Sequence, residues 1–184
     1  MQNGSTWPKH FRRPQAIRFL IILCLLAAGC NKSEPPANTE ANTDQKAGVT
    51  STGVVKATPS ETNITRGESG EAIVRLKIDH GYHVNANPPS FSYLIATQLD
   101  ITPANGIAVE SISYPPALTK KFSFSETALA VYEGEADVKV RLSTGKSATA
   151  GAHNLSAKLR VQACDDQICY APGSIDLTLP VSIK

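Results

Sequence analysis

Two cysteines, Cys164 and Cys169, are the residues of this sequence whose type and spacing most clearly suggest chemistry, in the stretch VQACDDQICYAPG. Their spacing fits a structural disulfide, half of a metal site, or a disulfide that opens and closes in thiol–disulfide exchange. Closing so short a loop stabilises a fold by only about 2 kcal/mol, against about 5 kcal/mol for a loop of roughly 100 residues. Short loops also tend to make the bond easier to reduce, but the spacing alone leaves all three interpretations open.

A metal site would need further ligands, and His80, His83 and His153 are the candidates. Four residues between two cysteines lie within the range of structural zinc sites. His80 and His83, however, fall in the glycine-containing stretch HGYH, where no regular element is expected to hold their direction. Methionine, a soft ligand that suits copper, occurs only as the initiator. We therefore expect no bound metal and no other cofactor.

Asp165 and Asp166 follow Cys164 directly and bear on the reactivity of both cysteines. Their negative charges disfavour a neighbouring thiolate, so a reduced pair should stay protonated and attack poorly. Such a pair suits a relay that reacts only after a partner has docked. The sequence contains no Ser/His/Asp spacing, glycine-rich phosphate loop or HExxH motif that would indicate another chemistry.

Alternation of apolar and polar residues with period two predicts the elements that position these cysteines. The clearest strands are expected at 71–79, 136–142, 154–163 and 175–183, and weaker ones at 53–58, 92–101 and 107–113. Pro180 suggests that the strand at 175–183 is an edge strand. Cys164 leaves the alternation of its strand, so it should face outward or lie where the strand breaks. Turn-rich segments separate the strands, and the pattern predicts an all-β domain, an antiparallel β-sandwich.

The first thirty residues are typical of a bacterial lipoprotein export signal. The apolar run from Phe19 to Gly29 is too short for a membrane span, which needs about 20 residues. Small residues precede Cys30 as in a lipobox, so we expect residues 1–29 to be removed and Cys30 to be lipidated. Ordinary secretory cleavage near Ala28 is the alternative. Residues 30–52 then form a lipidated cysteine and a flexible tether, and 53–184 form one domain.

The distribution of charge excludes one class of partner. The chain has 18 Lys and Arg against 16 Asp and Glu, but four of the basic residues and none of the acids precede Cys30. Without that leader the formal charge is −2, which provides no electrostatic attraction to a phosphate backbone. We expect no nucleic-acid partner, and contact with a membrane only through the lipid.

Three segments together resemble the N-terminal periplasmic domain of the thiol:disulfide interchange protein DsbD: VQACDDQICYAPGSIDLTLPV, DHGYHVNANPP and YPPALTKKFSFSETALAVYEG. The resemblance extends over residues 50–184, roughly. It implies an immunoglobulin-like sandwich with a reversible disulfide between Cys164 and Cys169 at one end. It also implies that Cys169 forms the mixed disulfide with partners, and that Cys164 is the resolving thiol.

A cap loop that shields the disulfide until a partner docks is a further feature that the resemblance implies. It maps onto KKFSFSE, where counting from Pro115 favours Phe124 as the shielding aromatic, with Phe122 second. Tyr82 and His83 match the aromatic residues beside the family's active site only loosely. Packing of a turn is an equally open interpretation of these two residues.

The function implied is that of a periplasmic, lipid-anchored thiol–disulfide exchange protein on the inner or outer membrane of the bacterial envelope. Its donor would be a thioredoxin-like or membrane thiol–disulfide protein, and its acceptor a periplasmic protein similar to a disulfide isomerase. DsbD continues into a membrane domain and a thioredoxin domain, whereas this sequence ends at Lys184, so we expect the donor to be a separate polypeptide. The alternative is a non-catalytic binding or assembly lipoprotein with a structural disulfide.

Overall fold

The computed structural model describes residues 48–184, and the expected signal peptide, Cys30 and residues 31–47 of the expected tether lie outside this range. Within it the regular structure is entirely β. The strands are β1 (Val55–Pro59), β2 (Thr62–Ile64), β3 (Ser69–Ile78), β4 (His83–Asn85), β5 (Gln98–Ile101), β6 (Ile107–Ser113), β7 (Leu118–Lys120), β8 (Leu129–Tyr132), β9 (Glu135–Thr144), β10 (Gly151–Val161), β11 (Ala163–Cys164) and β12 (Gly173–Ile183). Residues 48–184 contain no helix that is long and apolar enough to cross a membrane.

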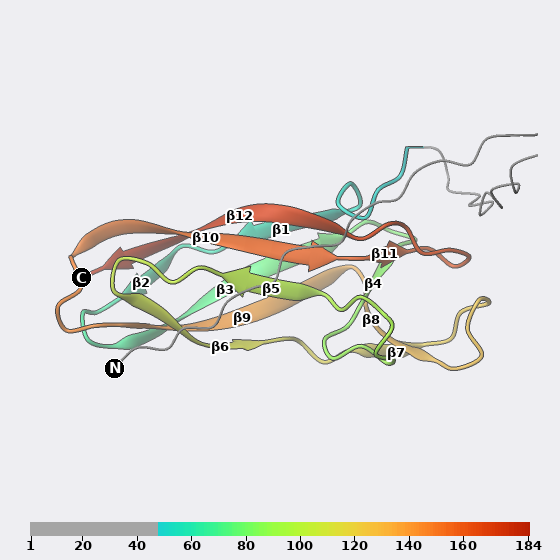
Figure 1. The fold of residues 1–184 in the computed structure, drawn as a ribbon, viewed down its shortest axis with the longest axis horizontal. Helices are drawn as coiled ribbons and strands as arrows, with labels where there is room; N and C mark the ends of the chain where they lie inside the picture. Colours follow the sequence, from blue (N-terminus) through green and yellow to red (C-terminus); the bar gives the residue numbers. More distant parts are fainter. Residues whose placement is uncertain (1–47) are drawn as a thin grey trace, which may run out of the picture. The chain divides into compact units, whose positions relative to one another are not determined.

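Two four-stranded sheets form the body of the domain, in the strand orders β1-β3-β9-β6 and β2-β12-β10-β5 (Figure 1). Neighbouring strands are antiparallel, except that β2 runs parallel to the end of β12, over Val181–Ile183. The prediction of an all-β, immunoglobulin-like antiparallel sandwich is confirmed.

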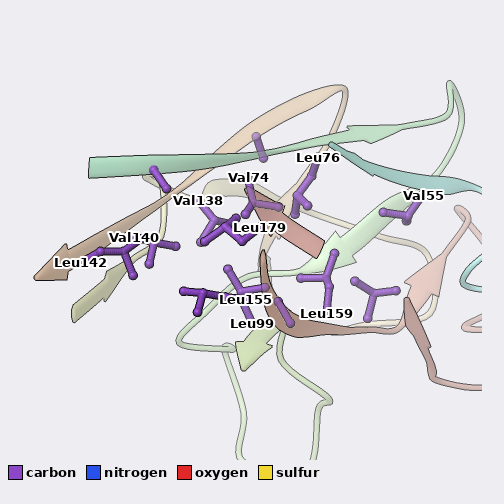
Figure 2. Packing of buried hydrophobic residues seen from close by; sticks show 14 of the residues in the cluster. Val55, Val74, Leu76, Leu99, Val138, Val140, Leu142, Leu155, Leu159 and Leu179 are labelled. Atoms are coloured by element: carbon purple, nitrogen blue, oxygen red, sulfur yellow. The ribbon is translucent and has the colours of Figure 1, made fainter. Parts of the chain in front are cut away.

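The core lies between these two sheets and is built by the alternation seen in the sequence. Strand β3 contributes Val74 and Leu76, and its neighbour β9 contributes alternate residues on the same face of the sheet. Leu155, Leu159 and Leu179 come from the opposite sheet, and Figure 2 shows the two sets of side chains packed against each other. Because each strand has one apolar face, burial of that face determines its register with its neighbours.

The long strands are confirmed, with boundaries moved by a few residues at most. The weaker strand expected at 92–101 begins only at Gln98. Strand β12 lies at an edge only in part, because β10 pairs with its whole length and β2 pairs with it from Val181 onward. Pro180, which has no backbone N–H to donate, lies immediately before that second pairing begins.

A third sheet, in the order β11-β4-β8-β7, was not predicted. Its strands are two to four residues long, too short to show a period in the sequence. In Figure 1 it lies at the end of the domain opposite the C terminus, and the loops that follow β7 and β11 extend beyond it. This end of the sandwich holds both cysteines.

Candidate functional site

Cys164 and Cys169 face each other across a short hairpin. They are joined by a disulfide, and their Cα atoms are 3.9 Å apart. The amide of Asp165 donates to the carbonyl of Ile168 (2.9 Å), and the amide of Tyr170 donates to the carbonyl of Ala163 (2.8 Å). Backbone hydrogen bonds on both sides of the disulfide therefore keep the two cysteines opposite each other.

The two cysteines differ in their exposure to solvent. Strand β10 ends at Val161 and β11 begins at Ala163, so Cys164 lies just beyond a break, one of the two positions expected for it. Cys164 is nevertheless only 1% exposed, whereas Cys169 is partly exposed. An incoming thiolate meets less obstruction at Cys169.

The carboxylate of Asp165 holds the hairpin in shape. Its Oδ1 accepts hydrogen bonds from the amides of Gln167 and Ile168, both at 2.9 Å, and its Oδ2 accepts one from the hydroxyl of Tyr170 at 2.7 Å. Burial, together with the hydrogen bond to Asp165, raises the pKa of Tyr170, so its hydroxyl stays protonated and remains a donor. Asp165 thus has a structural role in addition to the electrostatic effect expected from the sequence. Asp166 is exposed.

Ser51 ties the two arms of the hairpin to the N-terminal segment. Its hydroxyl accepts from the amide of Ala163 (3.0 Å) and donates to the carbonyl of Ala171 (2.6 Å), and the residue is buried. Gly173 permits this approach, because a Cβ atom there would lie 2.6 Å from Cγ2 of Thr52. Folded contacts therefore begin before residue 53, inside the segment that we expected to be tether, and no feature of the sequence indicated this role of Ser51.

His83 and Tyr82 both lie beside the cysteines. In the antiparallel pairing of β4 with β11, His83 is directly opposite Cys164. The ring of Tyr82 lies 6.0 Å from that of Tyr170, tilted by 54°. The structure thus brings together the two residues that the sequence related to the active site only loosely.

The loop between β7 and β8 contains the two phenylalanines expected to shield the disulfide. Phe122 is 4% exposed and stacks on His83, with 4.0 Å between ring centroids, and it packs in a small cluster with Leu129 and Val131. Phe124 is 40% exposed, and its ring is nearly parallel to that of Phe122 at 5.3 Å. Phe122 therefore anchors the loop, and Phe124 is its more exposed aromatic.

One hydrogen bond connects this loop directly to the cysteine hairpin. The hydroxyl of Ser123, between the two phenylalanines, donates to the carbonyl of Asp166 at 2.8 Å. The bond lies at the surface and involves neutral groups, so it contributes about 1 kcal/mol at most. A contact of this strength can hold the loop near the hairpin and still break when a partner docks.

Burial dominates the electrostatics around His83. It lowers the pKa of His83 to about 4, against the smaller opposing effect of Glu133. The imidazole is therefore neutral at pH 7. Lys120 forms an ion pair with Glu133 (2.6 Å). A neighbouring groove of about 580 Å³ is lined in part by Lys120, Asp166 and Tyr82. The groove carries charges of both signs.

Among residues 48–184, no three His, Cys, Asp or Glu side chains gather in a way that could hold a metal ion. His153 lies near the start of β10, whereas the hairpin follows the end of that strand, and its Nε2 lies 2.8 Å from the carbonyl oxygen of Thr149. His80 belongs to the lining of the groove.

Comparison with known proteins identifies related domains. Residues 54–179 match the family model described as "Thiol:disulfide interchange protein DsbD, N-terminal". Among solved structures, the DsbD N-terminal domain of Neisseria meningitidis in its reduced form is similar at 19% identity, with a TM-score of 0.42, over 63% of this chain and 79% of that one. The N-terminal periplasmic domain of ScsB from Proteus mirabilis is similar at 16% identity, with a TM-score of 0.48, over 68% of this chain and 44% of that one. No curated protein matches the chain.

Proposed function

Because the chain belongs to the family of N-terminal domains of the thiol:disulfide interchange protein DsbD, we propose that it is a periplasmic thiol–disulfide relay tethered to a membrane through Cys30. The observation that supports this most is the disulfide between a buried Cys164 and a partly exposed Cys169, beside a loop that carries two phenylalanines. A disulfide between one partly exposed and one buried cysteine favours attack at the more exposed residue, Cys169.

The exchange has two halves. In the first, a thiolate of the donor attacks Sγ of Cys169, the bond to Cys164 breaks, and its electron pair passes to Sγ of Cys164. A second thiol of the donor then attacks the donor's own sulfur in the mixed disulfide and releases Cys169, which leaves a dithiol here and a disulfide on the donor. In the second half, Cys169 attacks a disulfide of the acceptor, and Cys164 resolves the mixed disulfide, so two electrons are passed on.

The partners proposed follow from this chemistry and from the family. The donor is a thioredoxin-like or membrane thiol–disulfide protein, and the acceptor is a periplasmic protein similar to a disulfide isomerase. The groove beside Tyr82, Lys120 and Asp166 adjoins the hairpin and offers both charge signs to a docking protein. A lipid on Cys30 and a tether would keep the domain near the membrane, at the bacterial cell envelope.

The midpoint potential of the disulfide tests this function against the alternative of a tethered binding protein with a structural disulfide. Equilibration of the protein with thiol redox buffers is expected to give a potential above about −300 mV, because structural disulfides of exported proteins lie below that value. Repeating the titration with a thioredoxin-like donor should show reduction of the disulfide. A lower potential, or a bond that the donor leaves intact, would favour the structural alternative.

Removal of the exposed aromatic of the loop tests shielding. Phe124→Ala is expected to increase severalfold the rate at which dithiothreitol reduces the disulfide, because Phe124 is the outer ring over His83 and Phe122. Tyr93→Ala is a matched control, since Tyr93 is 74% exposed and lies outside the loop. If the rate with Phe124→Ala equals that of the control, Phe124 is not the cap, and Phe122→Ala becomes the variant to measure.

A further inference from the structure

Cys164 must carry a negative charge in an unfavourable place during each exchange. When the disulfide opens at Cys169, the electron pair of the broken bond stays on Sγ of Cys164. This residue is buried, and Asp165 and Asp166 follow it in the chain. Burial and neighbouring carboxylates both raise the free energy of a thiolate relative to the thiol. A hydrogen-bond donor near Cys164 would therefore have a large effect on the rate of thiol–disulfide exchange.

His83 is the polar side chain that the fold places opposite this sulfur. The two residues are paired directly in the β4–β11 ladder. Side chains of directly opposed residues lie on the same face of a sheet, with Cβ atoms about 5 Å apart. Both residues are 1% exposed, so the pair is shielded from bulk water. The stack on Phe122 keeps the imidazole plane in this position.

The Nε2 atom of His83 has no hydrogen-bond partner within residues 48–184 while the disulfide is intact. Buried polar atoms in folded proteins are nearly always paired, and one that is not calls for an explanation. The charged groups around the ring are Glu133 after β8, Lys120 at the end of β7, and the two acids of the hairpin. Lys120 is engaged by Glu133, so it is not free to neutralise a thiolate on Cys164.

We propose that Nε2–H of His83 donates a hydrogen bond to the Cys164 thiolate that forms when the disulfide opens. This rests on the proposed exchange at Cys169. The bond between the two cysteine sulfurs breaks, a bond forms between Cys169 and the partner's sulfur, and the electron pair remains on Cys164. No proton moves, and His83 stays neutral throughout. Because the hydrogen bond exists with the thiolate and not with the disulfide, it stabilises the transition state selectively.

The pKa of Cys164 measures this interaction without any partner. The full chain with Cys24→Ser, Cys30→Ser and Cys169→Ala contains Cys164 as its single thiol. Its thiolate absorbance near 240 nm, followed against pH, gives the pKa directly. In this background His83→Phe keeps an aromatic ring against Phe122 and removes the N–H. It is expected to raise the pKa of Cys164 by about one unit, a tenfold loss of thiolate at a given pH.

His83→Gln is the second variant, because its amide offers an N–H of similar reach. It is expected to recover at least half of the shift. A loosened loop would hydrate the thiolate and lower its pKa, which is the opposite direction. The proposal is overturned if His83→Phe leaves the pKa unchanged or lowers it, or if His83→Gln raises it as much. Since the measurement uses no donor, a negative result here is distinct from a failed potential measurement for the relay.

Discussion

Cys164→Ala is expected to accumulate a mixed disulfide through Cys169, and Cys169→Ala is expected to form almost none. With Cys164 removed, nothing within the hairpin can resolve a bond between Cys169 and an added thiol compound. With Cys169 removed, the remaining sulfur is that of buried Cys164. Since reactivity follows access as well as thiolate character, we expect the rates to differ by roughly tenfold or more.

Both variants are best measured in the full chain with Cys24→Ser and Cys30→Ser, so that one thiol remains. Each is mixed with oxidised glutathione, and the adduct is quantified by intact mass over time. A thioredoxin-like protein that lacks its own resolving cysteine, and whose remaining cysteine carries glutathione in a mixed disulfide, then replaces oxidised glutathione as a model partner. Attack by Cys169 on the thioredoxin sulfur releases glutathione as the leaving thiol. Equal rates for the two variants, or a faster reaction of Cys164, would reverse the roles assigned to the cysteines.

Leu159→Ala is expected to lower the free energy of unfolding by about 3 kcal/mol, within the range of 2–5 kcal/mol for buried leucines. Leu159 is fully buried on β10, where it lies between Ile175 of β12 and Leu99 of β5. Its removal leaves a cavity among strands that are paired on both sides, where collapse is restricted. Urea denaturation of the oxidised protein, followed by far-UV circular dichroism, measures the change in the free energy of unfolding.

Leu118→Ala is the matched control, because it removes the same atoms from a side chain that is 53% exposed on β7. It is expected to change the free energy of unfolding by less than about 0.5 kcal/mol. A similar loss for both variants would mean that burial between the two large sheets is not what distinguishes Leu159.

The long strands could be predicted because their chemistry is local. Ala72, Val74, Leu76 and Ile78 alternate with polar residues, and the structure buries this set. A strand in a two-layer sandwich has one face in the core and one in water, so this alternation is its sequence signature. The same argument holds for β9 and β10, whose inward residues were identified correctly.

The third sheet could not be predicted in this way. The three residues of β4 are all buried, because Val84 belongs to the main core while Phe122 of the loop between β7 and β8 stacks on His83. A strand buried on both faces shows no alternation, and three residues are too few for any period. His83 therefore looked like part of a glycine-containing turn, although the fold places it opposite Cys164.

Ser51 illustrates a contact that joins distant parts of the chain. It lies in a polar segment typical of a tether, yet its hydroxyl bridges Ala163 and Ala171, more than a hundred residues away. Similarly, the hydrogen bond between Ser123 and Asp166 links two loops from different hairpins. Such contacts depend on which loops the sandwich brings to the same end.

The sequence by itself determined the all-β class and the inward face of each long strand, and it singled out the two cysteines that we propose as the redox centre, because each depends on residues close together in the chain. Only the tertiary structure decided that Cys164 is buried while Cys169 is partly exposed, that Phe122 anchors its loop while Phe124 is exposed, and that His83 faces Cys164. These features arise from β4, β8 and β11 meeting at one end of the sandwich. The burial of Cys164 and the exposure of Cys169 depend on how these strands pack together, so no single segment of the sequence encodes them.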